Sequence, residues 1–217
     1  MSPATLTISS RTYSSWSLRG WLMCKMAGLA FEERLLPADD PSARAELLLL
    51  SPSFLVPCLE HDGAKVWDTL AIGEYLAELN PGSNLLPTDR KMRAHCRSVC
   101  GEMHSGFANL RAALPMNVKA RHPGYRVFTG ARPDIERVTQ IWRACLTAHG
   151  GPFLFGTPTL ADAMYAPVCS RFETYDVPLD DACRAYQRTI MSWPLMVQWI
   201  ADAMAETDDI EEFEVEF

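Results

Sequence analysis

Hydrophobic positions near the start of the chain follow first the period of a strand and then that of a helix. Leu6 and Ile8 lie two residues apart on one face of a short apolar strand, Thr5 to Ser9. An amphipathic helix follows and runs to about Gly28. Its apolar residues recur at i, i+3, i+4, i+8 and i+11 and predict one buried stripe, formed by Leu18, Trp21, Leu22, Met26 and Leu29.

The next two segments predict a second strand and a second helix. Phe31 to Leu36 is interpreted as a strand that ends before Pro37. Ser42 to Leu50 contains good helix formers, begins at a serine that could cap it, and ends at Ser51-Pro52. The chain therefore continues to alternate between strand and helix.

A hairpin and a further helix complete the first part of the chain. Val56 to His61 and Ala64 to Trp67 predict two strands around Asp62-Gly63, because Asp-Gly is a strong short-range hairpin signal. Thr69 to Leu79 has helical spacing of its apolar residues and stops at Asn80-Pro81-Gly82. The predicted order of elements is β-α-β-α-β-β-α, an α/β arrangement.

The second part of the chain, residues 88–217, carries helical patterns and no further convincing strand. Thr159 and Asp162 have capping-box spacing before an apolar run. The acidic tail, Glu206 to Phe217, is either a solvated tail or a docked extension, and its composition favours partial disorder. Helix breaks leave about five helices and fall near His122-Pro123-Gly124, Gly150-Gly151-Pro152, Val177-Pro178 and Ser192-Trp193-Pro194. We expect two domains, an α/β domain over 1–82 and an all-α domain over 88–217.

Composition and charge limit the classes of partner. The 217 residues are 48% hydrophobic, which is ample for a packed core. A net charge of −7 argues against nucleic acid or an anionic membrane and favours a small molecule or a protein as the partner. No signal-peptide pattern and no stretch near the roughly 20 apolar residues of a membrane span are present, so we expect a cytoplasmic protein. Seven cysteines without a framework of short spacings fit reduced thiols.

The first helix begins at a run of hydroxyl-bearing residues, Tyr13-Ser14-Ser15-Trp16-Ser17. A helix start offers unpaired backbone N–H groups and the positive end of the macrodipole, and both favour an anion there. The serine hydroxyls could help to bind that anion. The simpler interpretation is that the serines are N-caps only.

Other chemistries have little support in the sequence. No Cys-x-x-Cys pair is present for dithiol exchange, and no Gly-rich phosphate loop occurs. Cys96 and Cys100, with His95 and His104 on one predicted helix, suggest a metal site, but their spacing is equally typical of a packed helix face. We therefore expect no metal, and we expect Cys24 to be a core residue.

Four motifs together resemble the cytosolic glutathione transferases, and the resemblance covers essentially the whole chain. They are Ser14 to Arg19, similar to the serine-bearing loop of zeta- and tau-like members; Ser51-Pro52 through Val56-Pro57, similar to the Asn-Pro…Val-Pro segment with its cis-proline; Asp68 to Ile72, similar to the Glu-Ser-Leu-Ala-Ile helix start; and Thr159 to Asp162, like the family's folding cap. The resemblance implies a thioredoxin-like first domain, an all-helical second domain and glutathione as co-substrate.

The resemblance also implies where glutathione binds. Asp68 would pair with the ammonium of the γ-glutamyl head, while the Thr69 hydroxyl and the free N–H groups of its helix would hold the carboxylate. A cis Pro57 would turn the Val56 backbone outward, so that it pairs with the cysteinyl main chain of glutathione as an added strand does. The alternatives are an N-cap role for Asp68 and a trans proline that opens a strand.

The sequence departs from the family's pattern at two places. Leu55 stands where many members carry a lysine or glutamine for the glycyl carboxylate, and Phe54 stands where a small residue is common. Arg11, Lys65 or a residue of the helical domain could replace that contact. Trp16 occupies the position of the cysteine in the zeta-like Ser-Ser-Cys motif, which weakens an interpretation as a maleylacetoacetate isomerase.

The pocket for a small-molecule electrophile is expected between the two domains. By resemblance its wall comes from Tyr13 and Trp16 and from the long helix after Arg90, where Met103 and Phe107 offer apolar surface. Methionine and aromatic residues at helical spacing are also typical of a core. The same helix is the family's usual dimer element, so the resemblance implies a homodimer.

Ser14 is predicted to stabilise the glutathione thiolate, because it stands five residues before Arg19, as the active serine does in Ser-Ser-Cys-Ser-Trp-Arg-like motifs. Tyr13 is the runner-up, since a tyrosine hydroxyl does this work in other classes of the family. The predicted function is a glutathione transferase that attacks a small hydrophobic electrophile, with a role in detoxification. The alternatives are a glutathione-dependent isomerase and a non-catalytic binding module.

Overall fold

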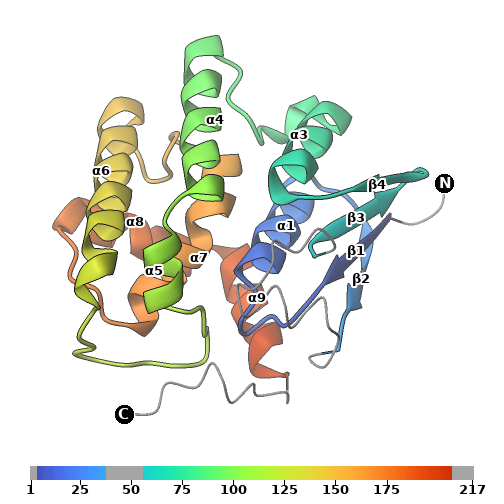
Figure 1. The fold of residues 1–217 in the computed structure, drawn as a ribbon. Helices are drawn as coiled ribbons and strands as arrows, with labels where there is room; N and C mark the ends of the chain where they lie inside the picture. The colour runs from blue at the N-terminus through green and yellow to red at the C-terminus, as the bar shows by residue number, and fades with distance from the viewer. Residues whose placement is uncertain (1–3, 38–55, 207–217) are drawn as a thin grey trace.

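The computed structural model describes residues 4–37 and 56–206 and arranges them in two parts that lie side by side (Figure 1). The first part is a mixed sheet flanked by helices, and the second part is built from helices. The predicted fold class, an α/β domain followed by an all-helical domain, is confirmed.

The sheet contains four strands in the order β2-β1-β3-β4. They are β1 (Ala4–Ile8), β2 (Phe31–Leu35), β3 (Cys58–His61) and β4 (Ala64–Val66). β1 runs parallel to β2 and antiparallel to β3, and β3 pairs antiparallel with β4. The turn between the last two strands has positive φ at both residues, 48° at Asp62 and 78° at Gly63, which confirms the predicted hairpin.

Two helices of the first part lie within the described ranges. They are α1 (Ser15–Met26), which begins at the predicted serine run, and α3 (Thr69–Leu79), which has the predicted bounds. A short 3₁₀ turn, η1 (Pro81–Ser83), follows α3 where the Asn-Pro-Gly signal predicted a stop. The helix predicted for Ser42 to Leu50 lies outside the described residues.

Six α-helices form the described region of the second part. They are α4 (Arg90–Ser105), α5 (Ala108–Ala113), α6 (Arg132–His149), α7 (Leu160–Thr174), α8 (Asp181–Met191) and α9 (Pro194–Met204), with a 3₁₀ turn, η2 (Thr129–Ala131), before α6. The breaks predicted from Pro and Gly all fall between these helices. α7 is the central helix, because nearly all of its residues are buried.

One helix break was missed, and the prediction that Met103 and Phe107 share a long helix is wrong. α4 ends at Ser105, Gly106 is extended, and Phe107 has left-handed backbone angles (φ 60°, ψ 35°) before α5 begins. This conformation is unfavourable for a residue with a bulky side chain. The Phe107 side chain is only 7% exposed, so its burial offsets the unfavourable backbone.

α1 is buried on more than the one predicted face. Leu18, Trp21 and Leu22 have no exposed surface, as predicted, but Met23 and Cys24 have none either. The additional burial arises because α1 contacts α3 on one side and α7 and α9 on the other, so that it lies between the two parts of the molecule (Figure 1). The start of α1 is therefore at the junction of the two domains.

Candidate active site

The start of α1 is held by three buried serines. Ser14 is the N-cap, and its Oγ accepts a hydrogen bond from the Ser17 backbone N at 3.2 Å. The same oxygen donates to Ser17 Oγ at 2.9 Å, and Ser17 Oγ accepts from the Ser9 backbone N at 3.0 Å. This cluster joins the end of β1 to the first turn of α1. Ser14 is therefore both the N-cap of α1 and a hydroxyl at the start of a helix.

Ser15, the first residue of α1, differs from its neighbour in two ways. It retains 6% of its surface, whereas Ser14 has no exposed surface. In the described ranges its hydroxyl makes no hydrogen bond, while its carbonyl accepts from Arg19 Nη1 at 3.2 Å. Ser15 is therefore a second hydroxyl at this helix start.

The Val56-Pro57 peptide bond is cis, as the resemblance implied. Val56 is 1% exposed, and β3 begins directly after Pro57. The proline ring lies against α1 at Gly20, where an added Cβ would stand 2.7 Å from Pro57 Cβ. Because Gly20 has no side chain, the Val56-Pro57 backbone can approach the first helix closely.

Asp68 is the N-cap of α3 and lies at the junction of the two domains. One carboxylate oxygen accepts from the Leu70 backbone N at 2.9 Å, and the other is 3.0 Å from His104 Nε2 on α4. The Asp68 side chain is still 46% exposed, so further partners can reach it. Thr69 beside it is fully buried, and its Oγ1 has no hydrogen-bond partner within residues 4–37 and 56–206. Asp68 and Thr69 therefore provide one accessible carboxylate and one hydroxyl that no described residue binds.

Trp16 follows the two serines and is surrounded by cations. Arg19 Cζ lies 4.4 Å from the centre of its ring and Arg111 Cζ lies 5.5 Å from it. The His104 ring approaches edge-on, with ring centroids 5.4 Å apart. Burial lowers the pKa of Arg111, although Asp134 opposes this change. In the part of the chain that the structure describes, Arg111 Nε has no hydrogen-bond partner. The surroundings of Trp16 are thus aromatic and positively charged.

The structure brings together some of the predicted site residues and separates others. Trp16 and Asp68 both contact His104, and they therefore share one region. Tyr13 is 5% exposed, whereas Met103 has no exposed surface and belongs to the main hydrophobic core. The sequence pattern suggests only a metal-ligand role for His104, because its contacts with Trp16 and Asp68 join segments far apart in the chain.

The histidines and cysteines that suggest a metal site in the sequence have other surroundings in the fold. His95 Nδ1 lies 3.3 Å from His149 Nε2, while Cys96 and Cys100 are fully buried in the core. In residues 4–37 and 56–206 no three His, Cys, Asp or Glu side chains are grouped so that they could hold a metal ion. The described helices also include none that is long and apolar enough to cross a membrane.

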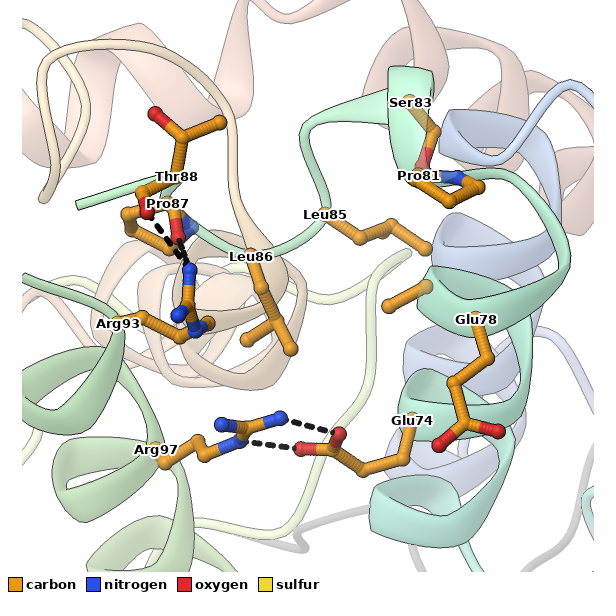
Figure 2. Close-up of a pocket in the computed structure, with 11 residues that line it drawn as sticks. Glu74, Glu78, Pro81, Ser83, Leu85, Leu86, Pro87, Thr88, Arg93 and Arg97 are labelled. Atoms are coloured by element: carbon orange, nitrogen blue, oxygen red, sulfur yellow. Dashed lines mark hydrogen bonds and ion pairs between the residues drawn. The ribbon is translucent and has the colours of Figure 1, made fainter. Parts of the chain in front are cut away.

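A separate cavity of about 270 Å³ lies between α3, η1 and the start of α4 (Figure 2). Leu85 and Leu86 supply apolar surface, and Arg97 bridges to Glu74 through two hydrogen bonds of 2.7 Å. None of the residues predicted to bind glutathione or the electrophile lines this cavity. It is therefore distinct from the region around Trp16 and Asp68.

Comparison with solved structures shows the fold. A glutathione transferase homologue from Burkholderia with bound glutathione superposes with a TM-score of 0.70 at 23% identity, over 94% of this chain and 100% of that chain. A maleylacetoacetate isomerase from Anaeromyxobacter dehalogenans with bound GSH in its active site gives a TM-score of 0.68 at 24% identity, over 96% of this chain and 100% of that chain.

Comparison of the sequence with family models and with named proteins shows, in addition to the fold, the family of this chain. The model described as "Glutathione S-transferase, N-terminal domain" matches residues 13–79, and that for the C-terminal domain matches residues 127–202. A maleylacetoacetate isomerase of Mus musculus is 34% identical over 78% of this chain and 78% of its own length. One of Rhizobium meliloti is 32% identical over 76% of this chain and 81% of its own length. The chain belongs to the glutathione S-transferase family.

Proposed function

We propose that this protein is a glutathione transferase that activates the glutathione thiol for attack on a small hydrophobic electrophile. The observation that carries the proposal is the junction between the domains, where the start of α1, the cis Val56-Pro57 bond and the Asp68-Thr69 pair occur in a chain of this family. These groups offer the donors, the acceptor and the fixed charge that a zwitterionic thiol peptide requires.

The γ-glutamyl head of glutathione is assigned to Asp68 and Thr69. The half-exposed Asp68 carboxylate pairs with the ammonium group. The Thr69 hydroxyl, which has no hydrogen-bond partner among the described residues, binds the carboxylate at the start of α3, where the Leu70 N–H already donates to Asp68. The Val56 backbone pairs with the cysteinyl main chain, in the manner of an added strand.

The thiol is assigned to the start of α1, with Ser14 as its hydrogen-bond donor. A thiol with a pKa near 8.5 is only a few per cent ionised at pH 7, so the enzyme must stabilise the thiolate. A hydroxyl hydrogen can rotate, so that Ser17 donates to Ser14 Oγ over their 2.9 Å separation while Ser14 donates to sulfur. Ser15, whose slightly exposed hydroxyl has no partner among the described residues, is the competing donor, and Tyr13 is the third candidate.

The electrophile is assigned to the region beside Trp16 and Tyr13. A glutathione-dependent isomerase is the second candidate function, because relatives named maleylacetoacetate isomerase are 32% and 34% identical to this chain. The cations Arg19 and Arg111 beside Trp16 also favour an acceptor that carries negative charge.

We also propose a homodimer that acts in the cytoplasm with a role in detoxification. Family resemblance supports α4 as the dimer element, and the net charge of −7 disfavours a nucleic-acid partner. Sedimentation equilibrium of the purified chain tests the dimer, with twice the 24.3 kDa chain mass expected.

Glutathione binding by calorimetry, followed by turnover assays, tests the proposed activity. The acceptor panel contains an aromatic halide, an epoxide, an enone and maleylacetoacetate. Conjugation of at least one acceptor is expected. Isomerisation of maleylacetoacetate without conjugation would favour the second candidate, and binding without turnover on any acceptor would indicate a binding module.

A further inference from the structure

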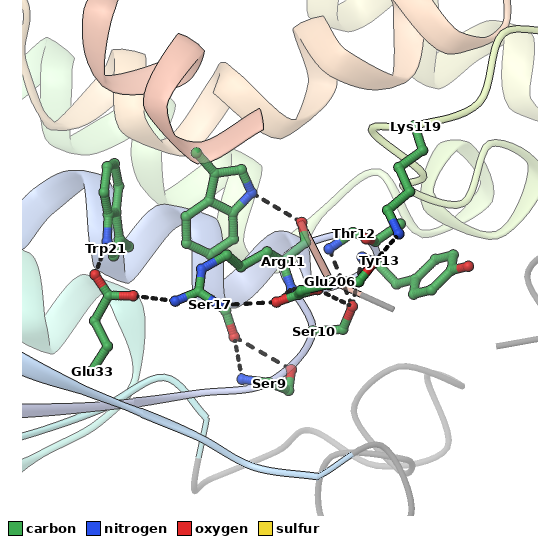
Figure 3. Close-up of polar contacts among 11 residues, drawn as sticks. Ser9, Ser10, Arg11, Thr12, Tyr13, Ser17, Trp21, Glu33, Lys119 and Glu206 are labelled. Carbon is green, nitrogen blue, oxygen red and sulfur yellow. Dashed lines mark hydrogen bonds and ion pairs between the residues drawn. The ribbon is translucent and has the colours of Figure 1, made fainter. Parts of the chain in front are cut away.

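The loop between β1 and α1 is bound to the end of the helical part through a charged network (Figure 3). The Arg11 guanidinium lies between two carboxylates, Glu33 on β2 and Glu206 just after α9. Glu206 Oε1 is 3.0 Å from Arg11 Nη1, and Glu206 Oε2 accepts from the Arg11 backbone N at 3.0 Å. One carboxylate thus binds both the side chain and the main chain of Arg11.

The contact continues from Glu206 to the serine run through Ser10. Ser10 Oγ donates to Glu206 Oε2 at 3.4 Å and accepts from the backbone N–H groups of Thr12 and Tyr13 at 3.1 and 3.3 Å. The Ser10 carbonyl accepts from the Ser14 backbone N at 2.9 Å. Ser10 therefore fixes the path of the chain into Ser14, and Glu206 fixes Ser10.

Further hydrogen bonds join the loop of residues 10–14 and Glu206 to other elements of the helical part. Trp199 on α9 donates its indole N–H to the Arg11 carbonyl at 3.0 Å, and the Val118 backbone N donates to the Thr12 carbonyl at 3.2 Å. Lys119 Nζ donates to the Glu206 carbonyl at 2.8 Å. The side chains of Arg11 and Glu206 are only 17% and 12% exposed, so solvent screens their attraction less than it would at an open surface.

Removal of Glu206 alone would leave Arg11 with a counter-charge. Glu33 still binds Arg11 Nη2, and Trp21 donates its indole N–H to Glu33 at 2.8 Å. A Glu206→Gln variant is therefore expected to keep the fold while it loses the negative charge and one of the two acceptor oxygens that Ser10 and Arg11 share. Because Glu33 still neutralises Arg11, the role of Glu206 can be tested without leaving a buried charge unpaired.

We propose that Glu206 is a positioning residue, which holds the loop of residues 10–14 so that the start of α1 is aimed at the glutathione sulfur. The inference rests on the proposed function, because the sulfur is assigned to the start of α1. It makes the helical domain a determinant of thiol ionisation at a site formed by the first domain. Glutathione affinity, by contrast, comes mainly from Asp68, Thr69 and Val56.

The test compares Glu206→Gln with Glu206→Asp and the wild type. Three quantities are measured for each: the pH dependence of thiolate absorbance of bound glutathione, the pH profile of kcat/KM with a conjugated acceptor, and the glutathione Kd by calorimetry. We expect Glu206→Gln to raise the pKa of the bound thiol by about one unit, which lowers kcat/KM about tenfold below that pKa. The Kd should change less than about threefold. Glu206→Asp keeps the charge and should recover part of the shift.

Two further variants control the experiment. Glu102→Gln removes a carboxylate that binds Arg137 through two hydrogen bonds of 2.6 and 2.9 Å on the surface of α4 and α6, and its pH profile should match the wild type. Ser10→Ala removes the hydroxyl between Glu206 and Tyr13 while it leaves the ion pair, and it should reproduce the Glu206→Gln shift. If Glu206→Gln does not fold, Ser10→Ala alone tests the proposal.

The proposal is overturned if Glu206→Gln and Ser10→Ala fold and keep the wild-type pH profile. It is equally overturned if they weaken glutathione binding without moving the thiol pKa, which would indicate a structural role. Failure of the proposed function is visible separately, because the wild-type protein itself would then bind no glutathione or show no thiolate absorbance.

Discussion

Asp68 and Asp162 both stand at the start of a helix and both accept backbone hydrogen bonds there, but their surroundings are opposite. Asp162, in the capping box of α7, has no exposed surface and accepts from Leu154, Thr159 and Tyr186. Asp68, the N-cap of α3, is 46% exposed. The comparison shows how one type of local motif can be fully occupied by the protein in one place and left partly available for a ligand in another.

We call the fully buried Asp162 the closed cap and the half-exposed Asp68 the open cap. The largest expected effect is a loss of stability when the closed cap is removed. Asp162→Ala leaves the Leu154 N–H, the Thr159 N–H and hydroxyl, and the Tyr186 hydroxyl without their shared acceptor. We expect it to lower the free energy of unfolding by roughly 3 to 5 kcal/mol, because each buried unpaired donor is costly. Urea unfolding measures this loss. A loss below about 1 kcal/mol would show that the two caps are not as different as their burial suggests.

Asp162 should also make the free energy of unfolding depend on pH. Burial raises the pKa of Asp162 to about 6, although hydrogen bonds from Leu154, Thr159 and Tyr186 oppose the rise. A carboxyl whose pKa is higher in the folded state than its unfolded value near 3.9 stabilises the fold fully below about pH 4, and this contribution is lost as the pH rises through about 6.

The matching measurement is unfolding of the wild type and of Asp162→Asn between pH 4 and pH 7. We expect the wild type to lose on the order of 3 kcal/mol relative to the variant across that window, from a shift of about two pKa units. Parallel curves for the two proteins would contradict the assigned pKa.

The open cap should affect binding and leave stability nearly unchanged. Asp68→Asn keeps a good N-cap but removes the charge assigned to the ammonium group. Because the carboxylate is half exposed, we expect a loss of about 2 kcal/mol in glutathione binding, or roughly 30-fold in Kd. Calorimetry measures the Kd and thermal unfolding provides the control. An unchanged Kd would remove Asp68 from the site.

The smallest effect is expected at the start of α1. Ser14 there is fully buried, like Asp162, whereas the adjacent Ser15 keeps some exposed surface, like Asp68. Ser14→Ala should raise the pKa of bound glutathione by about one unit and also weaken the helix cap by about 1 kcal/mol. Ser15→Ala should do neither, and Tyr13→Phe serves as the third variant. The pH profile of kcat/KM identifies the donor: if only Ser15→Ala or Tyr13→Phe shifts it, Ser14 is a cap alone.

Local signals in the sequence were sufficient for much of the fold. The Asp62-Gly63 pair predicted the hairpin, and apolar spacing followed by Asn-Pro-Gly predicted α3 with its observed bounds. The spacing of Thr159 and Asp162 also predicted the capping box that begins α7. Each of these features depends on residues that are neighbours in the chain, so a single sequence contains the information.

Features that depend on distant segments were not predictable in the same way. The contact of His104 with Asp68 and that of Glu206 with Arg11 each join residues from different domains. The left-handed Phe107 was missed because burial of its ring, a tertiary effect, outweighs its local backbone preference. The roles of Ser14, Val56, Pro57 and Thr69 stay predictions, since they concern a bound molecule.

Gly20 gives α1 a weakness that engineering could not repair without cost to the site. Replacement of a mid-helix glycine by alanine ordinarily stabilises a helix by up to about 1 kcal/mol. Here the added methyl group would collide with Pro57, whose ring would lie 2.7 Å away, and would push the Val56-Pro57 backbone off the helix. Attempts to make this protein more thermostable should therefore leave Gly20 unchanged and direct substitutions to helices that do not contact Val56-Pro57.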